Sequence, residues 1–402
     1  MNKEIKGRDI VIVGQQPWDV EIGSNCKNIA VELSKFNRVL YVNQALDRIT
    51  SLKNGNDPKI LKRKGVIRGK ENGLIPISDN LWNLFPDVLV ESINWIDSAF
   101  IFDVLNRRNN KLLAGSILKA MKTLNFRDII LFNDNDMFRS FHLKEFLQSK
   151  LSIYYSRDYM LAVDYWKKHG ERIEPLLIAK SDMCVANSTY LTDYCKQYNA
   201  KSFYIGQGCE IDMFSNLDKD DIAEEIINIP GSKIGYVGAL QSIRLDIELI
   251  AFIANSNPNW SVILVGPEDE VFKTSVLHDI PNIYFVGSKS PESLPRYINS
   301  FNVCINPQLI NQVTIGNYPR KIDEYLAVGL PVVATLTEAA SIFKDCIYLS
   351  ENKEEFVSLI EKAMSEDSME RVAYRKKVAA SHSWENSVNE LYKAMNEVTF
   401  NE

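Results

Sequence analysis

The sequence predicts an α/β protein of two domains, each built around a parallel sheet, and three observations lead to this fold class. The chain has 402 residues, more than the roughly 250–300 that a single hydrophobic core supports. Short apolar runs of strand length alternate with stretches of helical periodicity. This alternation starts afresh after an acidic segment, residues 211–232, which ends in Pro230-Gly231 and is typical of an interdomain linker.

The first half opens with a βαβ unit. A strand at 9–13, a helix capped by Ser24 and a strand at 38–42 follow one another. The loop between the first strand and this helix is longer than a Gly-x-Gly-x-x-Gly turn, so a dinucleotide-binding fingerprint is absent. The later elements expected in this half are helices near 98–106, 113–124 and 189–198 and strands at 128–132, 151–155, 181–185 and 202–205.

The second half repeats the pattern and ends in a separate helix. Strands are expected at 233–237, 261–265, 283–286, 303–306 and 332–334, and helices at 245–255, 290–300, 320–328 and 354–364. In the tail, apolar residues from Trp384 to Val398 recur on one helical face, which predicts a terminal helix that packs on a core.

Composition excludes several classes of function. A net charge of −6 argues against general nucleic-acid binding. The six cysteines are scattered, without Cys-x-x-Cys pairs or nearby histidines, which disfavours zinc sites and disulfide frameworks and favours a reducing compartment. Neither a signal peptide nor a run of ~20 apolar residues is evident, so we expect a cytoplasmic chain that at most lies on the inner face of a membrane.

Residues 53–70 interrupt the α/β rhythm with a strongly basic stretch. Seven lysines and arginines stand there against one acid, Asp57. The stretch is either a solvated surface loop or a patch that binds anionic lipid or a phosphate-bearing acceptor.

The most informative segment is 317–334, which predicts a loop, a helix from Arg320, a stop at Gly329 and a buried strand. The first turn of a helix presents free N–H groups and a positive dipole end, which suits a phosphate. Arg320 and Lys321 are unfavourable there unless an anion is bound. Glu324, one turn on, either accepts hydrogen bonds from sugar hydroxyls or forms an i,i+4 surface pair with Arg320.

This segment resembles the donor-binding signature of GT-B-fold, family-4-like glycosyltransferases (glycosyl transferases group 1). Tyr236–Ala239, Val262–Pro267, Asn282–Gly287 and Ser383-Trp384-Glu385 resemble further motifs of that family in the same order. The resemblance implies two Rossmann-like, doubly wound domains that face each other across a cleft, with the last helix crossing back to the first domain. We expect an acceptor-side domain at 1–214, a nucleotide-sugar-binding domain at 215–382 and the crossing helix at 383–402.

The resemblance also implies roles for single residues around the donor. Glu324 would hold the ribose hydroxyls, and Lys321, with Arg320 beside it, would lie next to the diphosphate. Gly238 matches the glycine turn that opens the second domain. Many relatives carry a pair of basic residues after the first strand of this domain, and the pair contacts phosphate. Arg244 is the one basic residue at this place here.

Two further positions bear on the same expectation. Gly23, with Ser24, fits the glycine-rich loop beneath the diphosphate. The acidic residue that many relatives carry eight positions before Glu324 is Gly316 here, which removes one contact to the donor sugar and leaves the donor's identity open.

Several residues of the first half are candidates for the acceptor side. Asp158, after the strand at 151–155, is our candidate acceptor-side base. Asp134-Asn135-Asp136 is also compatible with the metal–diphosphate motif of the other glycosyltransferase fold. Aromatic residues at 154–166, usually core, include Tyr159, Tyr165 and Trp166, which could stack on a sugar.

The function expected from these residues is a retaining, metal-independent glycosyltransferase. It would move a sugar from a nucleoside-diphosphate sugar, its co-substrate, to a glycan or lipid-linked acceptor in polysaccharide biosynthesis, without a further cofactor. Two alternatives stay open: a nucleotide-sugar 2-epimerase-like isomerase, and a non-catalytic subunit that binds sugar nucleotides.

Overall fold

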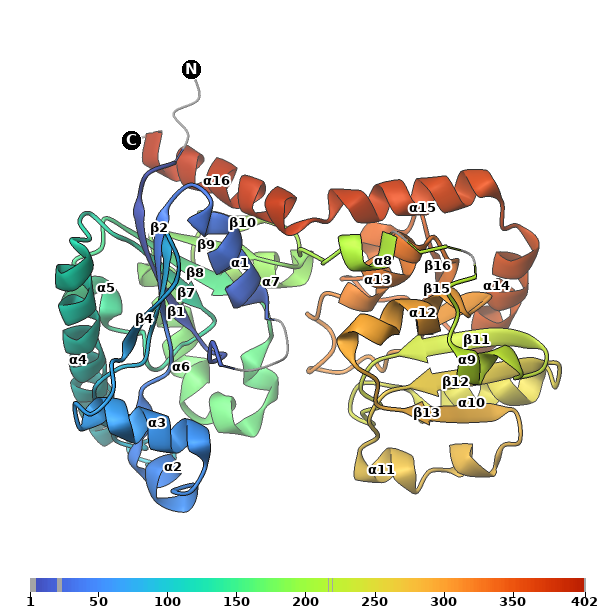
Figure 1. Ribbon diagram of the computed structural model, residues 1–402, viewed down its shortest axis with the longest axis horizontal. Coiled ribbons are helices and arrows are strands. Elements are labelled where there is room, and N and C mark those ends of the chain that lie inside the picture. Colours follow the sequence, from blue (N-terminus) through green and yellow to red (C-terminus); the bar gives the residue numbers. More distant parts are fainter. Residues whose placement is uncertain (1–4, 20–23, 216, 219, 401–402) are drawn as a thin grey trace. The chain divides into compact units, whose positions relative to one another are not determined.

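The structure, a computed structural model, describes residues 5–19, 24–215, 217–218 and 220–400. The chain forms two compact units (Figure 1). Unit 1 comprises Met1–Gly206 and Ser387–Glu402, and unit 2 comprises Gln207–Asn386. The α/β fold class predicted from the sequence is confirmed, since each unit is built around a parallel sheet.

Unit 1 contains an eight-stranded sheet with the order β10-β9-β8-β7-β1-β2-β5-β4. All neighbouring pairs are parallel except β4–β5, which is an antiparallel hairpin at one edge. Its strands are β1 (Asp9–Gly14), β2 (Arg38–Val42), β4 (Leu74–Ser78), β5 (Leu81–Leu84), β7 (Ile130–Asp134), β8 (Leu151–Ser156), β9 (Met183–Ala186) and β10 (Ser202–Tyr204). A two-stranded parallel sheet of β3 (Leu46–Asp47) and β6 (Leu89–Val90) lies apart from it.

Helices cover both faces of the unit 1 sheet. They are α1 (Asn25–Ser34), α2 (Arg48–Lys53), α3 (Pro58–Ile67), α4 (Ala99–Leu124), α5 (Leu143–Leu147), α6 (Asp164–Lys180) and α7 (Thr189–Lys196), with a 3₁₀ turn at Met160–Ala162. Figure 1 shows α4 and α5 on one side of the sheet and α1 on the other. The α4 side chains Leu113, Ile117 and Met121 pack on Val11 and Leu131 of the sheet. This burial on both faces explains why the central strands are continuous apolar runs in the sequence.

Unit 2 contains a six-stranded parallel sheet with the order β13-β12-β11-β14-β15-β16. Its strands are β11 (Ser232–Val237), β12 (Trp260–Val265), β13 (Ile283–Gly287), β14 (Val303–Asn306), β15 (Val332–Thr335) and β16 (Tyr348–Ser350). Its helices are α8 (Asp212–Ser215), α9 (Glu224–Ile227), α10 (Ile247–Ser256), α11 (Glu270–Lys273), α12 (Leu294–Asn299), α13 (Arg320–Val328), α14 (Lys353–Ser365) and α15 (Met369–Ser381), with 3₁₀ turns at Val276–Asp279, Pro291–Ser293 and Ser341–Phe343.

The unit 2 sheet separates two apolar cores. One contains residues of α12 and α13, such as Ile298 and Leu326, together with Val237 and Ile263 of the sheet. The other contains residues of α10 and α14 on the opposite sheet face. Helices therefore cover both faces, which is the doubly wound arrangement.

The last helix, α16 (Trp384–Phe400), begins in unit 2 and continues into unit 1. In unit 1 its Tyr392 hydroxyl accepts a hydrogen bond of 2.8 Å from Asn37 Nδ2, and Leu391 and Met395 are buried. In unit 2, the Trp384 ring lies against Gly208, where a Cβ atom would come within 2.2 Å of the ring. Among the described residues, no helix has both the length and the apolar character needed to cross a bilayer.

Two expectations about unit 1 need correction. The helices expected near 98–106 and 113–124 are one helix, α4, because the polar run between them is also helical. Side chains of this run form hydrogen bonds: Asn110 Nδ2 donates to the Phe138 carbonyl, and the Asn109 amide is hydrogen-bonded to the backbone of Glu91. The basic stretch is not a plain loop, since 58–67 form α3. Within it, the Arg63 side chain is buried and paired with Asp19 at 2.9 Å.

Candidate functional site

The carboxyl edge of the unit 2 sheet has the topology of a ligand site. From β11 the chain proceeds through β12 to β13 on one side, and then through β14 and β15 to β16 on the other. Ligands of doubly wound sheets bind at such a switch point, outside the carboxyl ends of the strands. Two isolated bridges, Leu240 with Glu268 and Leu245 with Gln308, join the loops that follow β11, β12 and β14.

A tight glycine turn follows β11. Gly238 has φ +142°, and its N–H donates to the Val265 carbonyl at 2.8 Å. Gly266, the residue directly after β12, has φ +151°, and a Cβ atom there would lie 2.0 Å from the Gly238 carbonyl oxygen. Both positions therefore require glycine, and the missing side chain at Gly238 leaves space above the end of β11.

Lys321 occupies that space. It lies in the first turn of α13, and a Cβ atom added at Gly238 would come within 2.1 Å of its Cε atom and 2.7 Å of its Nζ atom. Its ammonium lies 5.4 Å from the centre of the Tyr236 ring. Among the residues that the structure describes, no carboxylate lies within ion-pair distance of Lys321 Nζ. A half-buried cation without a counter-ion therefore stands at the switch point, beside a helix N-terminus.

The helix that carries Lys321 is held firmly in place. The Tyr325 hydroxyl is fully buried and accepts a hydrogen bond of 3.0 Å from Val237 N, at the end of β11. Ile322 and Leu326 are buried in the core below, and Gly329 ends the helix in the left-handed conformation, with φ +98°. These contacts fix the position of the first turn relative to β11.

Arg320 and Glu324 form the i,i+4 pair that the sequence left open. Arg320 Nε donates to Glu324 Oε1 at 3.1 Å. Arg320 is about half exposed, with a side-chain exposure of 47%, whereas that of Glu324 is 10%. The pair offsets the two charges and leaves the second carboxylate oxygen of Glu324 outside this contact. A ribose contact at Glu324 stays a prediction.

A buried polar group in the same helix was missed from the sequence. The Asp323 carboxylate has no exposed surface; it accepts from the Tyr318 hydroxyl at 2.8 Å and contacts His382 Nδ1 at 2.7 Å. Burial raises the pKa of Asp323, and the contacts with His382 and Tyr318 offset part of that rise. The cluster ties the loop before α13 to the segment before α16. No motif signalled it, because its members come from separate segments of the chain.

Arg244 lies on the same sheet edge but is not joined to Lys321. It belongs to the loop after β11, where its carbonyl accepts from Leu309 N at 2.9 Å, and its side chain is exposed. Ser242 in that loop is held by Asp269 through bonds of 2.7 and 2.9 Å. No contact between described residues links Arg244 to Lys321.

Asp158, the candidate base of unit 1, lies in an ionic cluster. Arg157 Nη1 donates to Asp158 Oδ2 at 2.5 Å, and Arg157 Nε donates to the buried Asp134 at 2.7 Å. The role of Asp158 as an acceptor-side base stays a prediction.

In the Asp134-Asn135-Asp136 triplet, Asp136 has a structural role. Asp136 Oδ1 accepts from the N–H groups of Phe138 and Arg139 at 3.2 and 2.9 Å, so it caps the turn after β7. Burial raises the pKa of the Asp136 carboxyl. Within the described part of the chain, no group of three or more His, Cys, Asp or Glu side chains is arranged to hold a metal ion. Gly23, the other unit 1 candidate, lies outside the described residues.

Comparisons with known proteins agree with this geometry. The model of the family Glycosyl transferases group 1 matches residues 231–366, which make up most of unit 2. The predicted resemblance to family-4-like glycosyltransferases is thereby confirmed for this part of the chain. The Bacillus subtilis (strain 168) protein TuaH, named as a teichuronic acid biosynthesis glycosyltransferase, is 24% identical over 237 residues. That match covers 56% of this chain and 59% of TuaH.

Solved structures resemble the chain along nearly its whole length. The Anabaena protein HepE in complex with UDP has a TM-score of 0.68 at 13% identity, covering 97% of this chain and 100% of HepE. The UDP-forming α,α-trehalose-phosphate synthase of Burkholderia vietnamiensis has a TM-score of 0.64 at 10% identity, covering 98% and 100%. These likenesses confirm the GT-B fold predicted from the sequence.

Proposed function

We propose that this chain is a glycosyltransferase that uses a nucleoside-diphosphate sugar in polysaccharide biosynthesis. One observation carries the proposal: Lys321, a cation without a counter-ion among the described residues, is fixed against Gly238 at the switch point of the unit 2 sheet. A diphosphate supplies the missing negative charge. The family match to unit 2 supports the same class, and TuaH supports the link to polysaccharide synthesis.

The proposed chemistry separates a sugar from its diphosphate. As the bond between the anomeric carbon and the diphosphate oxygen breaks, negative charge grows on the departing oxygen. A preorganised cation lowers the free energy of that transition state, and losing such a group typically costs about 10²–10³ in rate. In this proposal Lys321 is that group and the positive end of the α13 dipole adds to its effect, so no metal ion is required. The sugar is transferred with retention of its anomeric configuration.

A uridine nucleotide is the first donor to test. HepE structures contain UDP with glucose, and UDP-glucose. In our proposal Glu324 accepts hydrogen bonds from the ribose and Arg320 holds it in position, while Arg244 contributes long-range positive charge. The acceptor is a glycan or a lipid-linked glycan, and the exposed basic residues of 53–70 contact an anionic membrane surface.

Donor hydrolysis tests the proposal directly. The protein is incubated with a panel of UDP-, GDP- and dTDP-sugars, with and without EDTA, and release of nucleoside diphosphate is measured. We expect turnover of at least one donor that persists in EDTA and falls about 10²–10³-fold in Lys321→Ala. Absence of turnover and of nucleoside-diphosphate binding would refute the proposal. Turnover that needs added Mn²⁺ and is lost in Asp136→Ala would replace it with a metal-dependent mechanism.

A further inference from the structure

Exposed apolar side chains of unit 1 gather beyond the carboxyl ends of its strands. Figure 1 shows α2, α3 and the first turns of α4 at this end of the unit. Leu52 of α2, Trp95 before α4 and Phe100 in its first turn are 77%, 68% and 77% exposed. Further exposed apolar residues of α2 and α4 are Ile49, Ile101 and Val104. We call these six side chains the apolar face, because exposed patches of this kind mark contact surfaces.

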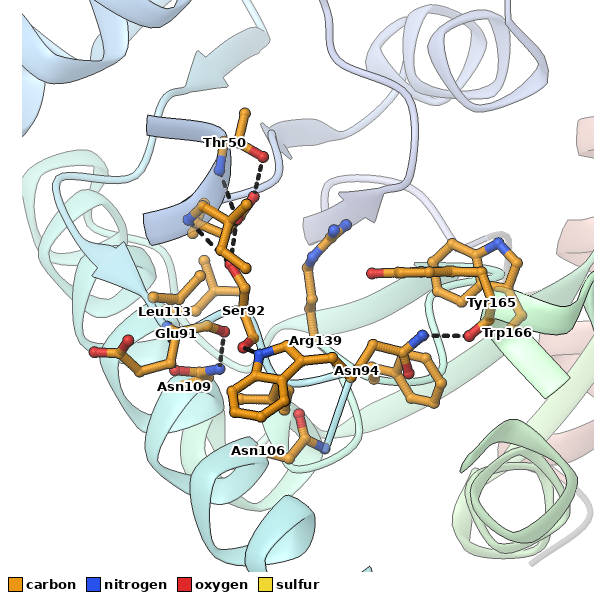
Figure 2. Close-up of a pocket in the computed structure, with 17 residues that line it drawn as sticks. Thr50, Glu91, Ser92, Asn94, Asn106, Asn109, Leu113, Arg139, Tyr165 and Trp166 are labelled. Atoms are coloured by element: carbon orange, nitrogen blue, oxygen red, sulfur yellow. Dashed lines mark hydrogen bonds between the residues drawn. The ribbon is translucent and has the colours of Figure 1, made fainter. Parts of the chain in front are cut away.

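Hydrogen bonds hold α2 and Trp95 beside one another. Ile49 N donates to Ser92 Oγ at 3.1 Å, and Trp95 Nε1 donates to the Ser92 carbonyl at 2.7 Å. Figure 2 shows Thr50 of α2 near Ser92, in the wall of a cavity of about 350 Å³ that Ile49 and Trp95 also line. The two segments therefore form one continuous surface.

The side chains of the apolar face can leave water without losing a hydrogen bond. Leucine and phenylalanine carry no polar side-chain atom. The one polar group of the Trp95 ring, its Nε1–H, is already paired with the Ser92 carbonyl. Transfer of the ring to an apolar medium therefore leaves no polar atom unpaired, and burial of its surface is favourable.

Basic residues border the apolar face, although the chain as a whole has a net charge of −6. Residues 48–70 contain eight lysines and arginines and one acid, Asp57. On α4, Arg107, Arg108 and Lys111 follow Val104 at helical spacing, so they continue the same side of the helix. Among the described residues, no carboxylate lies within ion-pair distance of the side chains of Lys53, Arg107 or Lys111.

The acids of this region do not cancel that charge. Residues 91–104 contain three carboxylates, and each is paired with a cation: Glu91 with Arg48 and Arg108, Asp97 with Lys168, and Asp103 with Arg172. The surroundings of the apolar face therefore complement an anionic surface.

This combination of apolar centre and basic border favours a lipid bilayer as the occupant. Val104 and Arg108 lie one turn apart, about 5–6 Å along the helix axis. Surface-bound proteins bury their apolar side roughly 5–10 Å into the headgroup and acyl boundary, with lysines and arginines on the polar side. A second copy of the chain fits less well, because the same basic border would face itself across a two-fold contact.

We propose that the apolar face inserts into the interfacial layer of an anionic bilayer. Leu52, Trp95 and Phe100 then lie below the phosphates, and the neighbouring lysines and arginines lie beside them. This inference rests on the proposed function, because it adds an apolar part to the membrane contact proposed for the basic residues of 53–70. Insertion makes a different prediction from attraction by charge alone, since binding must then depend on uncharged side chains.

Flotation of the full chain with defined vesicles tests this. The vesicles contain phosphatidylcholine alone, or phosphatidylcholine and phosphatidylglycerol in equal parts. We expect the wild type to bind the anionic vesicles, and Leu52→Ser and Phe100→Ser each to lower the partition coefficient about 5- to 20-fold. Both variants remove exposed side chains, so the fold should survive, and melting curves check this. Met369→Ser, which removes a 72% exposed apolar side chain of unit 2, should change nothing.

Tryptophan fluorescence reports the position of Trp95 itself. All six tryptophans of the chain are described, and Trp95 alone among them is exposed. Its emission should therefore shift to the blue on anionic vesicles and should be quenched by lipids with brominated acyl chains. Trp95→Phe should abolish the shift and keep most of the binding, because phenylalanine also inserts.

Salt separates insertion from attraction by charge alone. Added salt should weaken the binding of the wild type, because it screens the basic residues. The factor lost in Phe100→Ser should stay the same, because burial of apolar surface does not depend on screening. If Leu52→Ser and Phe100→Ser bind the vesicles as well as the wild type does, the inference is overturned.

UDP affinity, measured on the same samples, keeps this inference separate from the donor site. Vesicle binding that responds to Leu52→Ser and Phe100→Ser supports insertion even if UDP does not bind, a result that would refute only the donor site. UDP binding without vesicle binding overturns the inference, and so does vesicle binding that leaves the emission of Trp95 unchanged. A dimer in solution that Phe100→Ser dissociates also overturns it, because a second copy would then cover the apolar face.

Discussion

Replacing Gly238 by alanine puts a methyl group where the Lys321 side chain now lies. The new Cβ atom would be 2.1 Å from Lys321 Cε and 2.7 Å from Nζ, distances that real Cβ contacts do not show. Lys321 must therefore move, and we expect UDP affinity to fall roughly 10- to 150-fold, the equivalent of about 1.5–3 kcal/mol for a hydrogen bond to a charged group. The φ angle of +142° adds about 1–3 kcal/mol of backbone strain, which lowers the melting temperature.

A matched glycine and a double mutant separate these two effects. Gly287 also has a positive φ, +76°, but no atom lies within 4 Å of its added Cβ, so Gly287→Ala should lower stability while UDP affinity stays unchanged. In a Lys321→Ala background the methyl group of Gly238→Ala meets no lysine, and affinity should not fall further. Calorimetric titration with UDP measures all four variants. Wild-type affinity in Gly238→Ala, or an equal loss with and without Lys321, would refute this reasoning.

Three further predictions concern other parts of the chain. Glu324→Gln should weaken UDP binding by about 1.5–3 kcal/mol and leave the binding of inorganic pyrophosphate unchanged, because only the ribose contact is lost. If the wild type and Glu324→Gln bind UDP equally well, Glu324 only forms the ion pair with Arg320. Replacing the exposed basic residues Lys53, Lys59, Arg68 and Lys70 by serine should weaken binding to anionic vesicles by at most about 1 kcal/mol per charge, and the effect should depend on salt. If the wild type does not bind such vesicles, the proposed membrane contact is wrong. Burial raises the pKa of Glu174 above its usual value near 4.5, so the stability it contributes is present below that pH and is lost as the pH rises through the folded-state pKa. The free energy of unfolding of Glu174→Gln should therefore rise relative to that of the wild type as the pH rises from about 4 to about 8 in urea titrations. If the two proteins lose or gain stability in parallel over this range, the raised pKa of Glu174 is contradicted.

The fold was predictable because its signals are local. Apolar runs such as 9–13 and 261–265 form buried parallel strands, and Ser24 and Gly329 mark a helix start and a helix end as expected. The segment between β2 and α4 was not predicted, because its two short helices, the β4–β5 hairpin and the β3–β6 pair have no periodicity long enough to reveal them. The sequence alone places Arg63 in a surface patch, because nothing in its own segment indicates Asp19, its partner 44 residues earlier.

The candidate site was likewise predictable only where its signals are local in the sequence. Lys321 and the Arg320–Glu324 pair follow from the motif at 317–334 and from helical spacing, and Gly238 follows from the separate motif at 236–239. The structure brings Lys321 and Gly238 into contact. The Asp323 cluster depends on residues that only the tertiary fold assembles, because Tyr318 and His382 come from separate segments of the chain.

The most direct test of the central claim is a calorimetric titration of UDP and of uridine into the wild type, Lys321→Ala and Lys273→Ala, all in EDTA. Lys273 is an exposed lysine of unit 2 that is already paired with Glu270 at 2.7 Å, so it serves as the matched control. If Lys321 holds the donor diphosphate, UDP should bind the wild type and Lys273→Ala equally, and its affinity should fall roughly 10- to 150-fold in Lys321→Ala. Uridine, which lacks the diphosphate, should bind all three proteins alike. UDP affinity that is unchanged in Lys321→Ala, or that falls equally in Lys273→Ala, would contradict the account.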